Sequence, residues 1–326
     1  MSVLVTEGAG YLGSHILLAL EEAGLPAIAV DDLLNGAVWL VPDPSRLVIG
    51  DLGDENFIKR VIDDYAVTDV IHISGSINPS TSLKKPVLHY ERNVSNTLSL
   101  LRACLDRRVQ RVILSSTASV YGRPERTPVD ETAPVQSLTP YGASMAMAER
   151  ILTDVAAAGD IAYSILRYFN VAGSDAALRA GQIGKANNLI RVAAQIAAGA
   201  RREDLLIFGT DYPTPDGTAI RDYVHVTDLA DAHVAALSAL KEGNASRIYN
   251  CGYGRGYSVH EVINAVERVS GLSLPTQNAP RRSGDPPQLI ADSAAIRGEL
   301  DWRPRFDELD IIVRSSIAWE QRLHNA

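Results

Sequence analysis

The order of short apolar runs and helical patterns constrains this chain most strongly, because it matches a parallel sheet covered by helices. Runs rich in β-branched residues predict strands at residues 3–5, 27–30, 47–49, 70–72, 112–114 and 163–166. Patterns of helical period lie between the runs, at residues 11–23, 55–65, 87–107 and 141–157. Strands that alternate with helices in this way are typical of a doubly wound α/β fold.

The second half of the chain has a different rhythm. Helical patterns there are separated by short strands and by loops rich in proline and glycine, such as residues 211–217 and 279–285. We therefore expect a first domain over residues 1–169, to which residues 222–250 return. A second, smaller α/β domain is expected over most of residues 170–326.

Composition and charge exclude several classes of protein. The 326 residues carry a net charge of −8, and no basic tract could follow a phosphate backbone, so we expect no nucleic-acid partner. No run approaches the roughly 20 apolar residues of a membrane span, and no basic region followed by an apolar stretch opens the chain. Cys104 and Cys251 lie far apart without a histidine cluster, so we expect no metal site. A cytoplasmic location is expected.

A glycine-rich turn follows the first predicted strand. In the segment from Thr6 to Gly13, the glycines let the backbone turn tightly and bring helix N-terminal amides against a pyrophosphate. Asp31 ends the second strand, where a carboxylate can bind the adenosine ribose and repel the 2′-phosphate of NADP. We therefore predict a Rossmann domain that binds NAD. Glu7 occupies the position of the first glycine, where its side chain either turns toward solvent and only strains the turn or lies near the pyrophosphate.

Two further clusters point to chemistry on hydroxyl groups. The segment from Ser115 to Gly122 follows a strand and is rich in hydroxyl side chains, so it lies at the carboxyl edge of the sheet, where ligands bind. The segment from Thr139 to Met145 starts a helix at Pro140 and places Tyr141 and Met145 on one face. Together the clusters favour a catalytic site over a simple polar turn.

These residues resemble the extended short-chain dehydrogenase/reductase superfamily, and within it the UDP-glucose 4-epimerases. The resemblance covers essentially the whole chain. The segments Asp211-Tyr212-Pro213-Thr214 and Arg221-Asp222-Tyr223 are specific to the epimerases. The motifs that carry the resemblance are residues 3–13, Asn93, 115–122, Tyr141, 167–170, 187–189, 207–209, 211–218, 221–226 and 279–285.

The resemblance implies interconversion of UDP-glucose and UDP-galactose through a 4-keto sugar, with NAD as cofactor and a homodimer as the assembly. By position, Tyr141 would be the catalytic base, Thr117 its hydroxyl partner, and Met145 would stand where the family has a lysine. The cofactor would contact Gly8, Gly10, Tyr11, Leu12, Gly13, Asp31, Asn35, Asp51, Leu52, Ile73, Ser74, Gly75, Asn93, Ser115, Tyr141, Met145 and Tyr168. The UDP-sugar would contact Thr117, Tyr141, Phe169, Asn170, Asn188, Leu189, Phe208, Tyr212, Arg221, Arg282 and Asp285.

Three departures from the family pattern surround the cofactor. Met145 and Ile77 replace two lysines, and Glu7 adds a negative charge. A tyrosine with its ordinary pKa near 10 is ionised in about one molecule in a thousand at pH 7, and a neighbouring ammonium lowers that pKa. We therefore expect weakened catalysis. Two alternatives stay open: a catalytically inactive relative that binds a UDP-sugar or a partner, and an NAD-dependent dehydratase or reductase.

Overall fold

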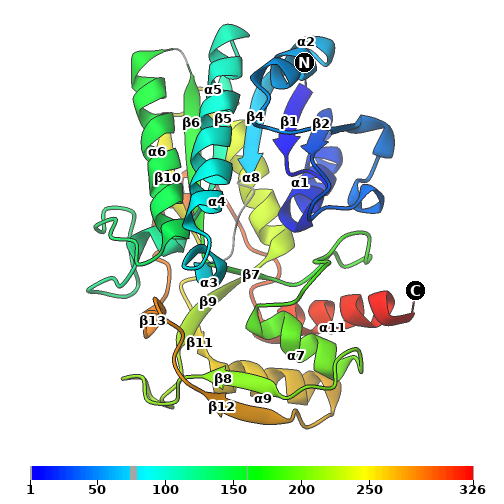
Figure 1. The fold of residues 1–326 in the computed structure, drawn as a ribbon, viewed down its shortest axis with the longest axis vertical. Helices are drawn as coiled ribbons and strands as arrows, with labels where there is room; N and C mark the ends of the chain where they lie inside the picture. Colours follow the sequence, from blue (N-terminus) through cyan, green and yellow to red (C-terminus); the bar gives the residue numbers. More distant parts are fainter. Residues whose placement is uncertain (1, 74–78, 160, 326) are drawn as a thin grey trace.

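A computed structural model describes residues 2–73, 79–159 and 161–325. Its larger layer is a seven-stranded parallel sheet in the order β10-β6-β5-β4-β1-β2-β3 (Figure 1). The six predicted strands are confirmed, because each lies within a strand of this sheet. The bounds are β1 Ser2–Thr6, β2 Ala27–Asp31, β3 Leu47–Ile49, β4 Val67–Ile73, β5 Arg111–Thr117, β6 Ala162–Tyr168 and β10 Arg247–Cys251.

Helices cover both faces of this sheet, as the alternating pattern predicted. One face packs against α1 (Tyr11–Glu22) and α8 (Val226–Lys241), and the other against α2 (Glu55–Asp64), α5 (Asn96–Asp106) and α6 (Pro140–Ala158). The strand order reverses between β1 and β4, where neighbouring crossovers run to opposite sides. Ligands of doubly wound folds bind in the crevice at the carboxyl ends of the strands at such a point.

The helix predicted over residues 87–107 is interrupted. The chain forms α4 (Pro86–Tyr90), a π-helical turn η3 (Glu91–Ser95) and then α5. The extra residue of a π turn rotates the side chains that follow it, and such turns are frequent at functional sites. Here the turn buries Asn93, whose amide Nδ2 donates a 3.0 Å hydrogen bond to Ser144 Oγ on α6. A short helix, α3 (Pro79–Ser82), precedes α4.

A smaller layer of short strands and helices lies below the large sheet in Figure 1. Strand β9 (Ile220–His225) pairs with β7 (Asn170–Ala172), β11 (Gly256–Ser258) and β13 (Gln288–Leu289). A second pair is formed by β8 (Leu205–Phe208) and β12 (Thr276–Ala279). Its core includes buried side chains of α7 (Leu189–Ala197), α9 (Val259–Ser270) and α11 (Leu309–Asn325).

The remaining short elements are η1 (Val38–Leu40), η2 (Pro44–Arg46), η4 (Ala118–Tyr121) and α10 (Ala294–Glu299). No helix in the described part of the chain is long and apolar enough to cross a bilayer. The described residues also hold no group of three or more histidine, cysteine or acidic side chains that could bind a metal ion. Cys104 and Cys251 are both buried free thiols.

Candidate active site

The glycine-rich turn between β1 and α1 leaves space that only glycine permits. A Cβ atom added at Gly13 would collide with the carbonyl oxygen of Glu7, and one added at Gly8 would lie 2.6 Å from Ala29 Cβ. Gly10 is the N-cap of α1 and supplies no capping side chain, so no side chain of the cap blocks the first amides of the helix. Leu12 is buried, while Tyr11 leaves the turn for the smaller layer. This cradle fits the pyrophosphate of a dinucleotide.

Asp31 lies beside this cradle at the end of β2. Its carboxylate accepts hydrogen bonds from the backbone amides of Ala9 at 2.9 Å and Leu33 at 2.8 Å. Burial raises the pKa of Asp31 from its usual value, and the two amides partly oppose that rise. Asn35 and Asp51 are exposed in neighbouring loops, and Leu52 is buried next to Asp51. The arrangement suits a ribose with its hydroxyls toward the sheet.

Glu7 strains the turn and is largely buried close to other carboxylates. Its φ of 52° lies in the left-handed region, where a non-glycine residue costs about 1–2 kcal/mol. Burial, followed by repulsion from Asp31, Asp32 and Asp51, raises the pKa of Glu7 to about 8, while Arg92 opposes the rise. The Glu7 side chain is therefore largely buried and is not turned toward solvent, although the turn is strained as well. At pH 7 the Glu7 carboxyl is mostly protonated, so it adds little negative charge there.

The catalytic pair is assembled from β5 and α6. Thr139 caps α6 by accepting a 3.2 Å hydrogen bond from the amide of Gly142, and Pro140 starts the helix. Tyr141 is then hydrogen-bonded to Thr117, the last residue of β5. Burial raises the pKa of Tyr141 to about 12, and the bond from Thr117 opposes this rise. No cation among the described residues contributes to lowering it.

Met145 is completely buried one turn after Tyr141. It packs in an apolar cluster with Tyr141, Phe169 and Leu289. Its thioether carries no charge and donates no hydrogen bond, so it replaces neither function of a lysine ammonium. The ring of His89 approaches Tyr141 edge-on, with 6.2 Å between centroids. The phenol therefore lies in a low-polarity pocket, which explains its high pKa.

Other predicted cofactor residues lie around this pair. Tyr168 ends β6, and Tyr141 contributes to the rise in its pKa after burial, which places the two phenols near one another. Ser115 is turned toward α8, because its hydroxyl is 2.7 Å from His233 Nε2. Ile73 ends β4 and is buried. Ser74, Gly75 and Ile77 lie outside the described residues.

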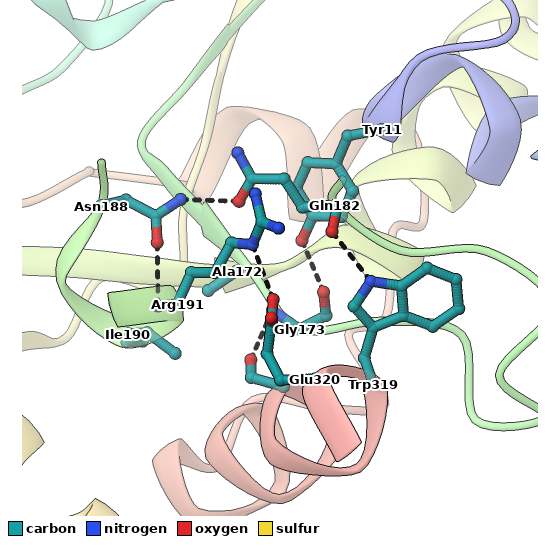
Figure 2. Close-up of a pocket in the computed structure, with 10 residues that line it drawn as sticks. Tyr11, Ala172, Gly173, Gln182, Asn188, Ile190, Arg191, Trp319 and Glu320 are labelled. Carbon is teal, nitrogen blue, oxygen red and sulfur yellow. Dashed lines mark hydrogen bonds and ion pairs between the residues drawn. The ribbon is translucent and has the colours of Figure 1, made fainter. Parts of the chain in front are cut away.

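Asn188 is the N-cap of α7 and lines a small cavity with Tyr11 (Figure 2), and Leu189 is the first residue of that helix. Asn188 Oδ1 accepts from the amide of Arg191 at 2.9 Å, and its Nδ2 donates to Gln182 Oε1 at 2.8 Å. Tyr11 reaches this cavity from the glycine-rich turn, and its hydroxyl donates a 2.6 Å hydrogen bond to the carbonyl of Gly173. Tyr11 from the glycine-rich turn and Asn188 from the predicted substrate set thus line the same small cavity. Asn170 begins β7 beside it.

The two predicted arginines face the acidic and aromatic members of the substrate set. Arg221 Nη2 lies 3.5 Å from Asp285 Oδ1, and the guanidinium of Arg282 lies 3.9 Å from the centroid of the Phe208 ring. Tyr212 is buried beneath Arg281, at 4.3 Å from its ring centroid. The guanidinium groups of Arg221 and Arg282 suit a diphosphate, because a planar guanidinium can bind two of its oxygens at once.

An open cavity of about 480 Å³ lies next to Asp285. It is lined by Arg123, Leu138, Ser283, Gly284 and Asp285, of which only Asp285 was predicted. Gln182 and Arg281 were also missed as neighbours of predicted substrate residues. The sequence contains a weak signal for Arg123 and Leu138, since they flank the loop between the hydroxyl-rich segment and Thr139. It contains none for Gln182.

Comparison with known proteins gives a consistent result. The NAD dependent epimerase/dehydratase family matches residues 3–252. The UDP-glucose 4-epimerase of Azospirillum brasilense is 52% identical over 325 residues, which cover 99% of this chain and 93% of that protein.

Solved structures agree over the full length. UDP-glucose 4-epimerase from Stenotrophomonas maltophila, with bound NAD and formylated UDP-arabinopyranose, superposes with a TM-score of 0.95 at 36% identity and covers 100% of this chain and 99% of that one. The enzyme from Bifidobacterium longum, in complex with NAD+ and UDP, gives a TM-score of 0.94 at 35% identity with the same coverage.

Proposed function

The chain belongs to the NAD dependent epimerase/dehydratase family, and we propose that Tyr141 and Thr117 carry out its UDP-glucose 4-epimerase reaction. One observation supports these roles most directly. The Tyr141 phenol is hydrogen-bonded to Thr117 at the carboxyl edge of the sheet, the edge that also holds the glycine-rich cradle and Asp31. An acid–base group, a cofactor cradle and a pair of arginines are the parts that this reaction needs.

The residues divide the work as follows. NAD, when bound, supplies the oxidised ring that takes a hydride from C4 of the sugar and returns it to the opposite face. Tyr141 accepts the proton of the C4 hydroxyl and later returns it. Thr117 holds the phenol oxygen in place. Arg221 and Arg282 bind the diphosphate, so the sugar can turn over while the nucleotide stays fixed.

We propose that this enzyme turns over slowly near neutral pH. The pKa of Tyr141 is about 12, so about one molecule in 10⁵ carries the tyrosinate at pH 7 before the cofactor binds. The positive ring of NAD lowers that pKa, but Met145 withholds the contribution of a lysine. Glu7 weakens cofactor binding through its strained backbone and, at higher pH, through its charge.

The test is conversion of UDP-glucose by purified protein supplied with NAD, with Tyr141→Phe as the control. Formation of UDP-galactose that disappears in Tyr141→Phe supports the proposal. Calorimetry on the same samples separates the alternative of an inactive relative. That alternative requires that the protein binds UDP-glucose but not NAD. It also requires that the protein interconverts neither UDP-glucose nor its N-acetylated and uronic-acid relatives.

We also propose a homodimer formed through α4, α5 and α6. Apolar side chains on these helices are exposed: Val87 is 65% exposed, Met147 48% and Leu105 44%. In Figure 1 these helices lie on the same face of the large sheet, where a second copy could cover them. Light scattering should give twice the monomer mass, and Val87→Glu together with Met147→Glu should give the monomer. A monomeric unmodified protein would refute the dimer.

We propose that residues 1–169 with 222–250 bind NAD, and that most of 170–326 binds the UDP-sugar. The proposal is supported by α8 and β10, which pack on and extend the large sheet. Residues 222–225 differ from the rest of the returning segment, because they lie in β9 and pair within the smaller sheet. A cytoplasmic location is proposed because both cysteines are free thiols. Detection of the tagged protein in the cytosolic fraction would test it.

A further inference from the structure

A chain of buried hydrogen bonds connects the cofactor turn to the helix that carries Tyr141. It starts at the end of β4, crosses to β1, returns to β4, and passes through α5 and η3 to α6. Every participating side chain is at most 2% exposed. The first half of the chain joins Ile73 N to Thr6 Oγ1 at 2.8 Å, Thr6 Oγ1 to His72 Nδ1 at 3.0 Å, and His72 Nε2 to Thr97 Oγ1 at 3.0 Å. The second half joins Thr97 Oγ1 to Asn93 O at 2.6 Å, Asn93 Nδ2 to Ser144 Oγ at 3.0 Å, and Ser144 Oγ to Tyr141 O at 2.7 Å.

From His72 to the carbonyl of Tyr141, the donors in this chain all point the same way. The single hydroxyl proton of Thr97 is used on the carbonyl of Asn93, so His72 must donate to Thr97 from Nε2. A neutral His72 then has an acceptor at Nδ1, and this nitrogen at 3.0 Å and the carbonyl oxygen of Ile73 at 3.1 Å share the single hydroxyl proton of Thr6. Burial lowers the pKa of His72 to about 4, so it is neutral at physiological pH. Aligned bonds polarise one another, and a break at one link weakens the rest.

The two ends of the chain are functional. Thr6 immediately precedes Glu7 and the glycine-rich turn, and Ile73 immediately precedes the segment predicted to border the cofactor. At the other end, Ser144 fixes the carbonyl of Tyr141 from one turn along α6, while its partner Asn93 is held in the π turn. His72 does not contact Tyr141 itself. It connects the elements that place the cofactor and the phenol.

We propose that His72 and Thr97 are positioning residues that set the Tyr141 phenol relative to the dinucleotide turn. This inference rests on the proposed function and deepens it. Loss of the proton from the C4 hydroxyl and of the hydride from C4 requires both acceptors to be in place at once, and displacement by about 1 Å can cost 10²-fold in rate. A chain of short buried bonds across β4, β1, α5, η3 and α6 limits such displacement, whereas apolar packing alone allows small slides.

The test uses two substitutions at one position. Thr97→Val keeps the branched shape and removes the hydroxyl, whereas Thr97→Ser keeps the hydroxyl and removes a methyl group. Amide hydrogen exchange on cofactor-free protein is the first readout. In Thr97→Val, amides of the first turns of α6 should exchange at least tenfold faster relative to the rest of the large sheet. Thr97→Ser should restore exchange to within about threefold of the original protein.

NAD affinity, measured by calorimetry, is the second readout. Thr97→Val should raise the dissociation constant at least fivefold, and Thr97→Ser should restore most of the affinity. Adding Ser144→Ala to Thr97→Val should change either readout less than twofold, because the chain is already broken, whereas Ser144→Ala alone should resemble Thr97→Val. Ser293→Ala is the matched control, since Ser293 is buried and also donates a 2.7 Å bond to a carbonyl, that of Gly252.

The outcomes separate this inference from the proposed function. Equal effects of valine and serine at position 97, or full additivity with Ser144→Ala, would mean that these residues only fill space, and the inference would be overturned. Lack of epimerase activity in the unmodified protein would refute the proposed function alone, because the exchange measurement needs neither cofactor nor turnover. If Thr97→Val does not fold, the same two readouts are compared between Ser144→Ala and the control Ser293→Ala. Equal effects of these two variants would overturn the inference.

Discussion

Replacing Met145 with lysine tests why Tyr141 is a poor base in this chain. Met145 is completely buried one helical turn from Tyr141, on the same helix face. A lysine at this position would direct its ammonium toward the phenol oxygen, as residues four apart on a helix are neighbours. The substitution therefore introduces one positive charge beside the group that must lose a proton, and leaves the Thr117 hydrogen bond in place.

The size of the effect follows from the geometry. Opposite charges 4 Å apart attract by about 4 kcal/mol at an effective dielectric constant of 20, which corresponds to about three pKa units. Neighbouring opposite charges in proteins shift a pKa by about 1–3 units. The pKa of Tyr141, now about 12, should fall to between about 9 and 11. Below that pKa, the tyrosinate population at fixed pH rises about 10-fold to 10³-fold, and the rate should rise with it.

The assay is the pH dependence of kcat for conversion of UDP-glucose, at saturating NAD. The rising limb of the profile should move to lower pH by about 1–3 units in Met145→Lys. Met145→Leu supplies no charge and nearly conserves the side-chain volume, so the rising limb of its pH profile should stay at the same pH as in the unmodified protein. Burial of the ammonium lowers the melting temperature, so rates are normalised to folded protein. A folded, NAD-loaded Met145→Lys whose limb has not moved would refute this electrostatic explanation.

Three further predictions concern residues around the site. The pKa of Glu7 is raised from its usual 4.5 to about 8, so the folded state loses stability as pH rises through this interval, by up to about 1.4 kcal/mol per pH unit. Glu7→Gln should remove this dependence of stability on pH in thermal melts between about pH 5 and pH 9. The same variant should keep its NAD affinity between pH 7 and 9, whereas the unmodified protein should lose affinity; an unchanged pH profile would contradict the assignment. Thr117→Val should lower kcat about tenfold at pH 8, because the bond that lowers the Tyr141 pKa is lost, and should leave NAD affinity within about twofold. Arg191→Met leaves Glu320 buried without its 2.7 Å partner and should reduce the free energy of unfolding by about 3–5 kcal/mol in urea titrations, while the double replacement with Glu320→Leu should recover most of it.

The large sheet could be predicted because its strands are short apolar runs between helical patterns. Buried parallel strands are apolar on both faces, so residues 112–114 stand out without knowledge of their neighbours. The π turn at Glu91–Ser95 could not be predicted, because the sequence through it keeps an ordinary helical pattern. A tertiary contact accompanies the π turn, because Asn93 is hydrogen-bonded to Ser144, which lies 51 residues further along the chain on α6.

The cofactor side of the site was easier to predict than the substrate side. Its residues follow strands directly, and the carboxyl ends of parallel strands meet at one edge. Substrate residues such as Arg282 lie on long loops. The resemblance to the family identifies these residues, but the sequence does not predict where a loop places them in space. The link between Thr6 and His72 was missed for another reason. A threonine and a histidine inside apolar runs resemble ordinary core polar residues until the strands are placed side by side.

The initial rate of UDP-galactose formation from UDP-glucose, followed from pH 7 to pH 9 with saturating NAD, tests the central claim most directly. Tyr141, buried beside Met145 without a cation, should make this rate climb steeply with each pH unit and without a plateau near neutrality. A rate that is already level at pH 7 would show that the phenol ionises easily in this pocket, and would contradict the account.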